Sequence, residues 1–273
     1  MASIALFSDF PDFARGVAKI LADRGDFIYV SDDHLIKEAA SKFSRDEKTL
    51  YNALECQPGL IQKFCSTGNR ELLCIEAVLA EHLLQDNTVF AGFVGYPLMG
   101  NVSHVMKVRL LCGIKDLMEL SKLTQLSEDK LESGIESRKA SYRKWVESNY
   151  GLDTSESSLY DITLNVGNLS LEETIGSILH TAKHERFQPM TYSLECVKDQ
   201  IVSSRVRVHV SAYDPRSEVR SRKGHVYVYT RGSMLKRKEQ ARKLKEELIR
   251  LDGVQQVEVY NKKEMFECVA CGH

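Results

Sequence analysis

Short apolar segments alternate with helix-like segments over about the first 185 residues, and this alternation constrains the fold more than any other feature of the chain. Parallel strands need long connections, usually helices, and those helices then cover both faces of the sheet. The pattern therefore predicts an α/β domain built on a parallel sheet. The predicted strands are residues 4–7, 27–30, 88–94, 104–112 and 161–166.

Helical periodicity fills the intervals between these strands. Ser170 and Glu173 form a capping box that predicts one helix start, and Ser31 or Asp32 caps another. Ligands of such sheets bind at the carboxyl ends of the strands, so the loops after Phe7, Val30 and Val94 are the expected places for chemistry. The other predicted helices are residues 12–24, 70–84, 115–123 and 128–150.

Charge divides the chain into two parts. Residues 201–273 contain 16 Lys and Arg against 9 Asp and Glu, whereas residues 1–200 contain 21 against 29. We expect a first domain at 1–188, a second at 189–263 and a tail at 264–273.

No apolar run approaches the roughly 20 residues of a membrane-spanning helix, and the N-terminus lacks signal-peptide features. The expectation is a cytoplasmic protein whose seven cysteines are mostly reduced.

Two stretches carry a family resemblance. The order of strand, loop and helix ending ARGVAKILADRG, then FIYVSDDHLIKEAA, resembles the start of the cytidylate-kinase-like family of P-loop nucleoside monophosphate kinases. The spacing of Glu136, Lys139 and Tyr142, followed by NYGLD and LYDITLNVGNLSLEET, is similar to a later part of that family. The resemblance implies a five-stranded parallel sheet, a mobile helical lid around residues 120–155, and ATP with Mg²⁺.

The loop after the first strand departs from that family. A phosphate loop needs glycines, so that backbone N–H groups can surround phosphate oxygens, together with Lys and Ser/Thr. This loop has no glycine, Pro11 offers no N–H, and none of the 16 glycines in the chain precedes a lysine. We therefore predict a degenerate phosphate loop, in which bulky Phe10 and Phe13 fill the space. Its residues are Ser8, Asp9, Phe10, Pro11, Asp12, Phe13, Ala14 and Arg15.

Other positions of the resemblance keep two interpretations each. Arg15 can contact a phosphate or be a solvated first-turn residue, and we favour the second. Asp32 and Asp33 follow the second strand and either orient an acceptor or cap a helix, while the adjacent His34 is expected to face solvent. Cations of the predicted lid either balance a transferred phosphoryl group or form a solvated charge ladder, which we favour. The lid cations are Arg138, Lys139, Arg143 and Lys144.

The second unit is predicted as a small α+β module with the order αββαβ. Its Gly224-His-Val226 and Gly253-Val254 segments resemble the BON domain, a bacterial module associated with phospholipid and other interaction surfaces. One helix is strongly basic and suits a phospholipid headgroup, nucleic acid or acidic protein, although a solvated face with no partner is the alternative. Its basic residues are Lys236, Arg237, Lys238, Arg242, Lys243 and Lys245.

The tail contains Cys268, Cys271 and His273, which are a weak candidate metal site, a redox pair or part of a frayed end.

Taken together, the sequence predicts a nucleotide-kinase-like protein that has lost phosphoryl transfer and acts as a regulatory or binding protein. The alternative is an active ATP-dependent phosphotransferase that acts on a nucleotide or another small acceptor. A homo-oligomer is compatible with either function.

Overall fold

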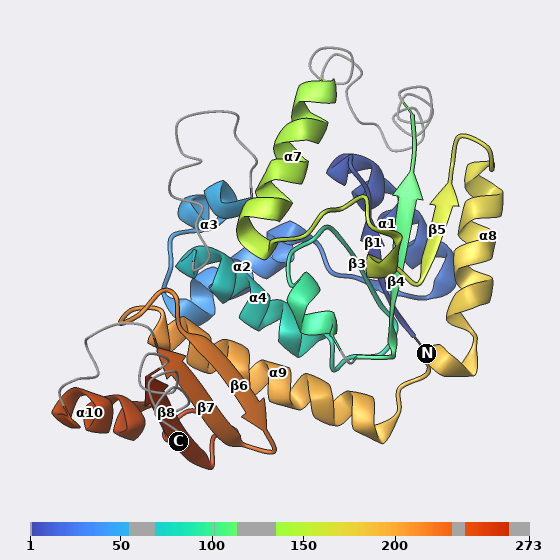
Figure 1. The fold of residues 1–273 in the computed structure, drawn as a ribbon. Helices are drawn as coiled ribbons and strands as arrows, with labels where there is room; N and C mark the ends of the chain where they lie inside the picture. The colour runs from blue at the N-terminus through green and yellow to red at the C-terminus, as the bar shows by residue number, and fades with distance from the viewer. Residues whose placement is uncertain (1, 55–68, 101, 114–134, 231–237, 262–273) are drawn as a thin grey trace, which may run out of the picture.

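The computed structural model describes residues 2–54, 69–100, 102–113, 135–230 and 238–261. Five parallel strands form one sheet in the order β2-β3-β1-β4-β5 (Figure 1). All five predicted strands are confirmed to within a few residues. The third ends early because the chain turns at Gly92, where φ is 115°. The strands are β1 Ser3–Phe7, β2 Ile28–Tyr29, β3 Thr88–Ala91, β4 Val105–Leu111 and β5 Ile162–Asn165.

Helices cover both faces of this sheet. Alternate side chains of β1 point to opposite faces, so that Ile4 and Leu6 enter one core and Ala5 and Phe7 enter the other. The first core is closed by α1 (Pro11–Gly25) and α8 (Leu171–Ala182). The second is closed by α2 (Asp32–Phe43), α3 (Glu47–Leu54), α4 (Arg70–His82), α7 (Ile135–Tyr150) and part of α9 (Thr191–Val210).

The residues predicted to cap the starts of two helices do so in the structure. Ser31 caps α2 by accepting the N–H of His34 at 3.2 Å, so neither Asp32 nor Asp33 is the cap. The predicted capping box of α8 is present between Ser170 and Glu173. The predicted helix at 115–123 and the first part of the one at 128–150 lie outside the described residues. Short 3-10 helices occur at η2 Tyr96–Met99, η3 Ser157–Leu159 and η4 Glu185–Phe187.

The second unit has the predicted αββαβ order. Strands β6 (Glu218–Arg222) and β7 (His225–Thr230) are antiparallel, and β8 (Gln256–Asn261) pairs parallel to β7. Helix α10 (Lys238–Leu248) connects these last two strands. Gly224 has φ of 78°, and a Cβ there would lie 2.9 Å from the carbonyl oxygen of Gly253, so the turn requires glycine. The BON-like assignment itself stays a prediction.

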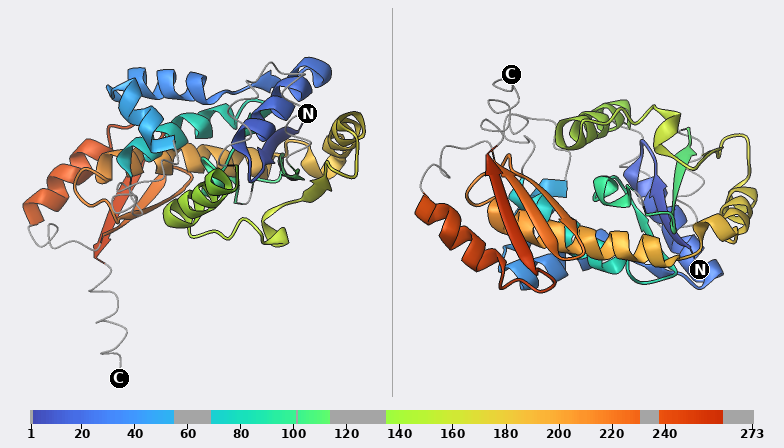
Figure 2. Two further views of the ribbon diagram at one scale, coloured as in Figure 1. Left: turned by 90° about the horizontal axis from the view of Figure 1, so that it is seen from above. Right: turned by 60° about the horizontal axis from the view of Figure 1, so that its bottom comes forward.

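Helix α9 belongs to two cores. Val197, Ile201 and Val208 pack with α4 and the five-stranded sheet. Other apolar side chains of α9 pack against β7, β8 and α10, and they are Val202, Val206 and Val210. The three-stranded sheet and α10 lie at one end of this helix, which runs along the first unit (Figures 1 and 2). The boundary at 188/189 remains a prediction, but α9, which follows it, also completes the core that α2, α4 and α7 form on the second face of the five-stranded sheet.

Candidate functional site at the carboxyl edge of the sheet

The loop between β1 and α1 uses several of its own backbone donors. The Ser8 hydroxyl accepts the N–H of Phe10 at 3.2 Å. The carbonyl of Phe10 accepts the N–H groups of Phe13 and Ala14 at 3.1 and 3.3 Å. Pro11 begins the helix and has no N–H to offer. These donors therefore do not surround an anion, as the amides of a phosphate loop would.

The two phenylalanines of the loop have different surroundings. Phe13 is buried in the core between α1 and the sheet, so the expectation that it fills the phosphate space is wrong. The first turn of an amphipathic helix directs its apolar side chain toward the sheet. Phe10 is half-buried at the edge of the same core, and the ammonium of Lys139 lies 5.5 Å from the centre of its ring. Phe10 thus covers the loop together with a cation from α7.

Asp9 is held by helix α7. The guanidinium of Arg143 donates to both carboxylate oxygens of Asp9, from Nε at 3.0 Å and from Nη2 at 2.5 Å. The Thr154 hydroxyl lies 3.5 Å from the same carboxylate. The Asp9 side chain is only 12% exposed, whereas Arg143 is 44% exposed. The lid-like helix is therefore tied to the loop, and the favoured interpretation of Arg143 as part of a solvated ladder is wrong.

Arg15 is paired on both sides. Its guanidinium lies 2.8 Å from Asp12 and 2.7 Å from Asp32. Burial alone would lower the pKa of Arg15, but the carboxylates of Asp32 and Asp12 outweigh it and raise that pKa above its usual range. The expectation of a solvated first-turn residue is wrong, because the start of α2 brings Asp32 against α1. Asp32 therefore serves as a partner of Arg15.

Asp33 faces a different neighbour. It accepts a hydrogen bond from the hydroxyl of Tyr51 on α3 at 2.5 Å. This bond is the main reason that the pKa of Tyr51 is raised to about 12. Asp33 thus links the start of α2 to the middle of α3, and its role as a contact for an acceptor stays a prediction.

The glycine turn after β3 is bonded to α7. The hydroxyl of Tyr142 accepts the N–H of Phe93 at 3.3 Å, and the hydroxyl of Tyr150 accepts the N–H of Gly95 at 3.4 Å. Gly95 has φ of 72°. The turn after β3 therefore directs two backbone amides to tyrosines of the lid-like helix.

A buried carboxyl group lies beneath this turn. Glu76 on α4 is only 4% exposed. Burial raises the pKa of Glu76, while the guanidinium of Arg207, 3.8 Å away, and a hydrogen bond from Tyr150 oppose that shift. Burial, followed by the charge of Glu76, likewise raises the pKa of Tyr150. Helices α4, α7 and α9 therefore meet at one polar contact inside the first unit.

Arg109 on β4 also reaches this edge, although the sequence did not single it out. It donates to the carbonyl of Ser155 at 3.1 Å and lies 5.4 Å from the ring centre of Tyr160. The sequence around an arginine inside a strand does not indicate which groups its side chain will contact. The position of Arg109 becomes known only from the register of β4 against β1. Its register partner Phe7 precedes the loop directly.

Among the residues that the structure describes around the loop, the oxygen donors do not fit Mg²⁺ with ATP. Magnesium needs oxygen ligands that are free to face the phosphates. The carboxylate of Asp32 is engaged by Arg15, and that of Asp33 accepts from Tyr51. The loop hydroxyl of Ser8 accepts a backbone N–H. No mechanistic step through bound Mg²⁺ follows from this donor set.

The remaining predicted site residues divide into two groups, and the roles predicted for both groups stay predictions. The first group is described: Arg242, Lys243 and Lys245 on α10 are exposed. The predicted site residues whose side chains lie outside the described part of the chain are Arg138, Lys236, Arg237, Lys238, Cys268, Cys271 and His273.

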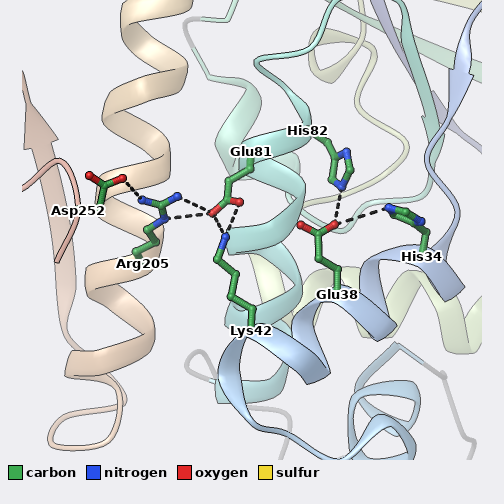
Figure 3. Close-up of polar contacts among 7 residues, drawn as sticks. All are labelled: His34, Glu38, Lys42, Glu81, His82, Arg205 and Asp252. Atoms are coloured by element: carbon green, nitrogen blue, oxygen red, sulfur yellow. Dashed lines mark hydrogen bonds and ion pairs between the residues drawn. The ribbon is translucent and has the colours of Figure 1, made fainter.

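A second polar cluster lies between α2 and α4 (Figure 3). His34 and His82 both face the carboxylate of Glu38. The expectation that His34 simply faces solvent is therefore incomplete. The spacing of His34 and Glu38, one helical turn apart, is a signal that the sequence offered, whereas His82 is distant in the chain.

Beside this cluster, Glu81 joins three elements (Figure 3). Its carboxylate accepts from Lys42 of α2 and from Arg205 of α9 at 2.9 Å. Arg205 in turn lies 3.2 Å from Asp252, which precedes β8. These ion pairs connect α2 and α4 of the first unit, through Arg205 of α9, with the residue that precedes β8 in the second unit.

The solved structures that resemble this chain have low identity. An uncharacterized protein from Eubacterium ventriosum matches with a TM-score of 0.49 and 13% identity, covering 66% of this chain and 97% of that one. A shikimate kinase from Bacteroides thetaiotaomicron has a TM-score of 0.42 and 11% identity, covering 67% and 99%. A shikimate kinase from Acinetobacter baumannii, in complex with shikimate, has a TM-score of 0.38 and 14% identity, covering 66% and 92%.

No curated protein matches the chain at a significant level. Among the described helices, none combines the length and the apolar character needed to cross a membrane. The model of the cytidylate kinase-like family matches residues 8–168, which is more than half of the chain and includes the loop, the glycine turn and α7. The chain therefore belongs to the cytidylate kinase-like family.

Proposed function

We propose that this chain is a kinase-like protein that has lost phosphoryl transfer and acts as a regulatory or binding protein. One observation carries the proposal: Arg15 of the phosphate loop and Arg143 of α7 are each paired with a carboxylate of that loop. Cations that hold phosphates in an active kinase must be available to the ligand. Here Asp9 and Asp12 hold them.

Electrostatics supports this assignment. A triphosphate entering the loop would lie beside the carboxylates of Asp9 and Asp12, and like charges at close range oppose binding. It would also have to displace the bidentate contact between Arg143 and Asp9. The backbone offers little compensation, since the N–H groups of Phe10 and Phe13 are bonded within the loop.

The alternative is an active ATP-dependent phosphotransferase. It is favoured by the convergence of Arg15, Lys139 and Arg143 on a single loop. In that case the phosphates would replace the carboxylates as partners of the arginines, and a small acceptor would lie near Asp33. The two functions therefore differ in their prediction for the wild type: the inactive protein forms no ADP with or without Arg15, whereas the active enzyme forms ADP and loses this activity when Arg15 is replaced.

The test is ADP formation from ATP with Mg²⁺, with nucleoside monophosphates and small hydroxyl compounds supplied as acceptors. Three proteins are compared: wild type, Arg15→Ala, and the control Arg24→Ala. Arg24 lies on the same helix but pairs with Glu172, away from the loop. We expect no acceptor-dependent ADP from any of them. ADP formed by wild type and Arg24→Ala, but lost in Arg15→Ala, would establish the active enzyme instead.

For the binding role, we propose that the second unit contacts an anionic surface. The exposed Arg242, Lys243 and Lys245 on α10 support it. Reversal of Lys236, Arg237 and Lys238 to Glu should abolish binding to vesicles that contain anionic lipid, and added salt should weaken the binding of the wild type. Binding to single-stranded RNA but not to vesicles would redirect the proposal to nucleic acid. Salt-insensitive binding would contradict an electrostatic surface.

A further inference from the structure

We propose that His34, Glu38 and His82 form a binding site for a divalent transition-metal ion of the Zn²⁺ class. The three side chains lie between α2 and α4 (Figure 3). They are separate from the carboxylate pairs at the phosphate loop. The proposal is therefore independent of whether the chain transfers phosphate.

The backbone brings the three ligand atoms together. His34 and Glu38 are four residues apart on α2, so their side chains lie on one face of that helix. His82 is the last residue of α4, which packs across α2. Nε2 of His82 lies 2.8 Å from Oε2 of Glu38, and Nε2 of His34 lies 3.6 Å from the same oxygen. One ligand atom from each residue lies within 4.8 Å of the others.

These distances suit a shared ion. Zinc binds His nitrogen and carboxylate oxygen at about 2.0–2.2 Å, so its tetrahedral ligand atoms are roughly 3.4 Å apart. His34 is 61% exposed and can rotate to close the remaining distance, while His82 is 13% exposed and fixes the inner side. The exposed side leaves a fourth position open to water.

The donor types select the metal. Two imidazole nitrogens and one carboxylate match the ligand set of open zinc sites, whereas Mg²⁺ and Ca²⁺ prefer oxygen ligands only. The adjacent carboxylate of Glu81 is engaged by Lys42 and Arg205 and adds no fourth ligand (Figure 3).

Both imidazoles point to the same oxygen of Glu38, so the three ligand atoms face one another instead of forming two separate pairs. The other nitrogen of His82, Nδ1, is buried without a hydrogen-bond partner in the described part of the chain. A ligating histidine normally donates from that nitrogen, and loss of such a partner weakens metal sites by about 10–100-fold. We therefore expect micromolar rather than nanomolar affinity.

The test titrates Co²⁺ into the full chain and follows its visible absorption, with Zn²⁺ competition measured by calorimetry. All proteins carry Cys268→Ser and Cys271→Ser, which removes the thiolates of the tail as ligands. In this background we compare His34→Ala, Glu38→Gln and His82→Asn with the control His225→Ala, an exposed histidine on β7.

We expect one Co²⁺ per chain with no thiolate charge-transfer band, weakened at least about tenfold by each cluster variant and unchanged by His225→Ala. Mg²⁺ should not compete. His34 is exposed, so that variant tests the site even if His82→Asn disturbs folding. Absence of Co²⁺ binding at millimolar concentration would overturn the proposal. Equal affinity in the background protein and in His34→Ala would overturn it as well.

Discussion

Replacement of Arg143 by alanine should detach helix α7 from the loop after β1. The contact with Asp9 is bidentate, and the Asp9 carboxylate is nearly buried while Arg143 is half-exposed. Exposed ion pairs contribute roughly 0–1 kcal/mol, and breaking a fully buried pair costs about 3–5 kcal/mol. This pair is intermediate, and the Thr154 hydroxyl at 3.5 Å compensates only weakly. We therefore expect a loss of about 1–2 kcal/mol in the free energy of unfolding.

Trp145 provides the assay. It is the single tryptophan of the chain, is buried on α7, and stacks on Tyr142, so its fluorescence reports the docking of this helix. Urea unfolding of Arg143→Ala, Asp9→Ala and the double variant gives the coupling energy between the two residues, which should be about 1 kcal/mol. Lys144→Ala, an exposed change on the same helix, should stay within about 0.5 kcal/mol of wild type. A coupling energy near zero would refute the reasoning.

Three further changes test other parts of the first unit. Because burial raises the pKa of Glu76, its contribution to stability is present at acidic pH and is lost as the pH rises through that pKa. Glu76→Gln should therefore gain stability relative to wild type between acidic and neutral pH, and denaturant titrations that show a constant difference would contradict this sign. Gly95→Ala should destabilise by more than about 1 kcal/mol, because φ is 72° and the new Cβ would lie 2.6 Å from Leu79; an unchanged thermal midpoint would count against this. Ser170→Ala should cost about 1 kcal/mol through loss of the capping box, whereas Ser177→Ala, at a half-buried position inside the same helix, should cost less in the same melting experiment.

The fold was predictable where the signals are local. The five strands follow from short apolar segments, and the start of α8 follows from Ser170 and Glu173, which are three residues apart. The double role of α9 was not predictable in the same way. Its apolar side chains belong to two separate cores, and the helical periodicity of the sequence does not indicate which of the two cores each side chain enters.

The candidate site was harder to predict, because its contacts join residues far apart in the chain. The loop and its missing glycines are visible in the sequence, but Asp9 meets Arg143 across 134 positions. Arg15 resembled a solvated residue because Asp32 approaches it only after the chain passes through β2. His82 likewise reaches Glu38 only through the packing of α4 on α2.

The most direct test of the central claim is a calorimetric titration of the wild-type chain with ATP and Mg²⁺. Because the loop carboxylates hold Arg15 and Arg143, we predict no binding heat up to millimolar ATP. Micromolar binding that Arg15→Ala weakens would contradict the claim, since it would mean that the arginines exchange their carboxylate partners for phosphate.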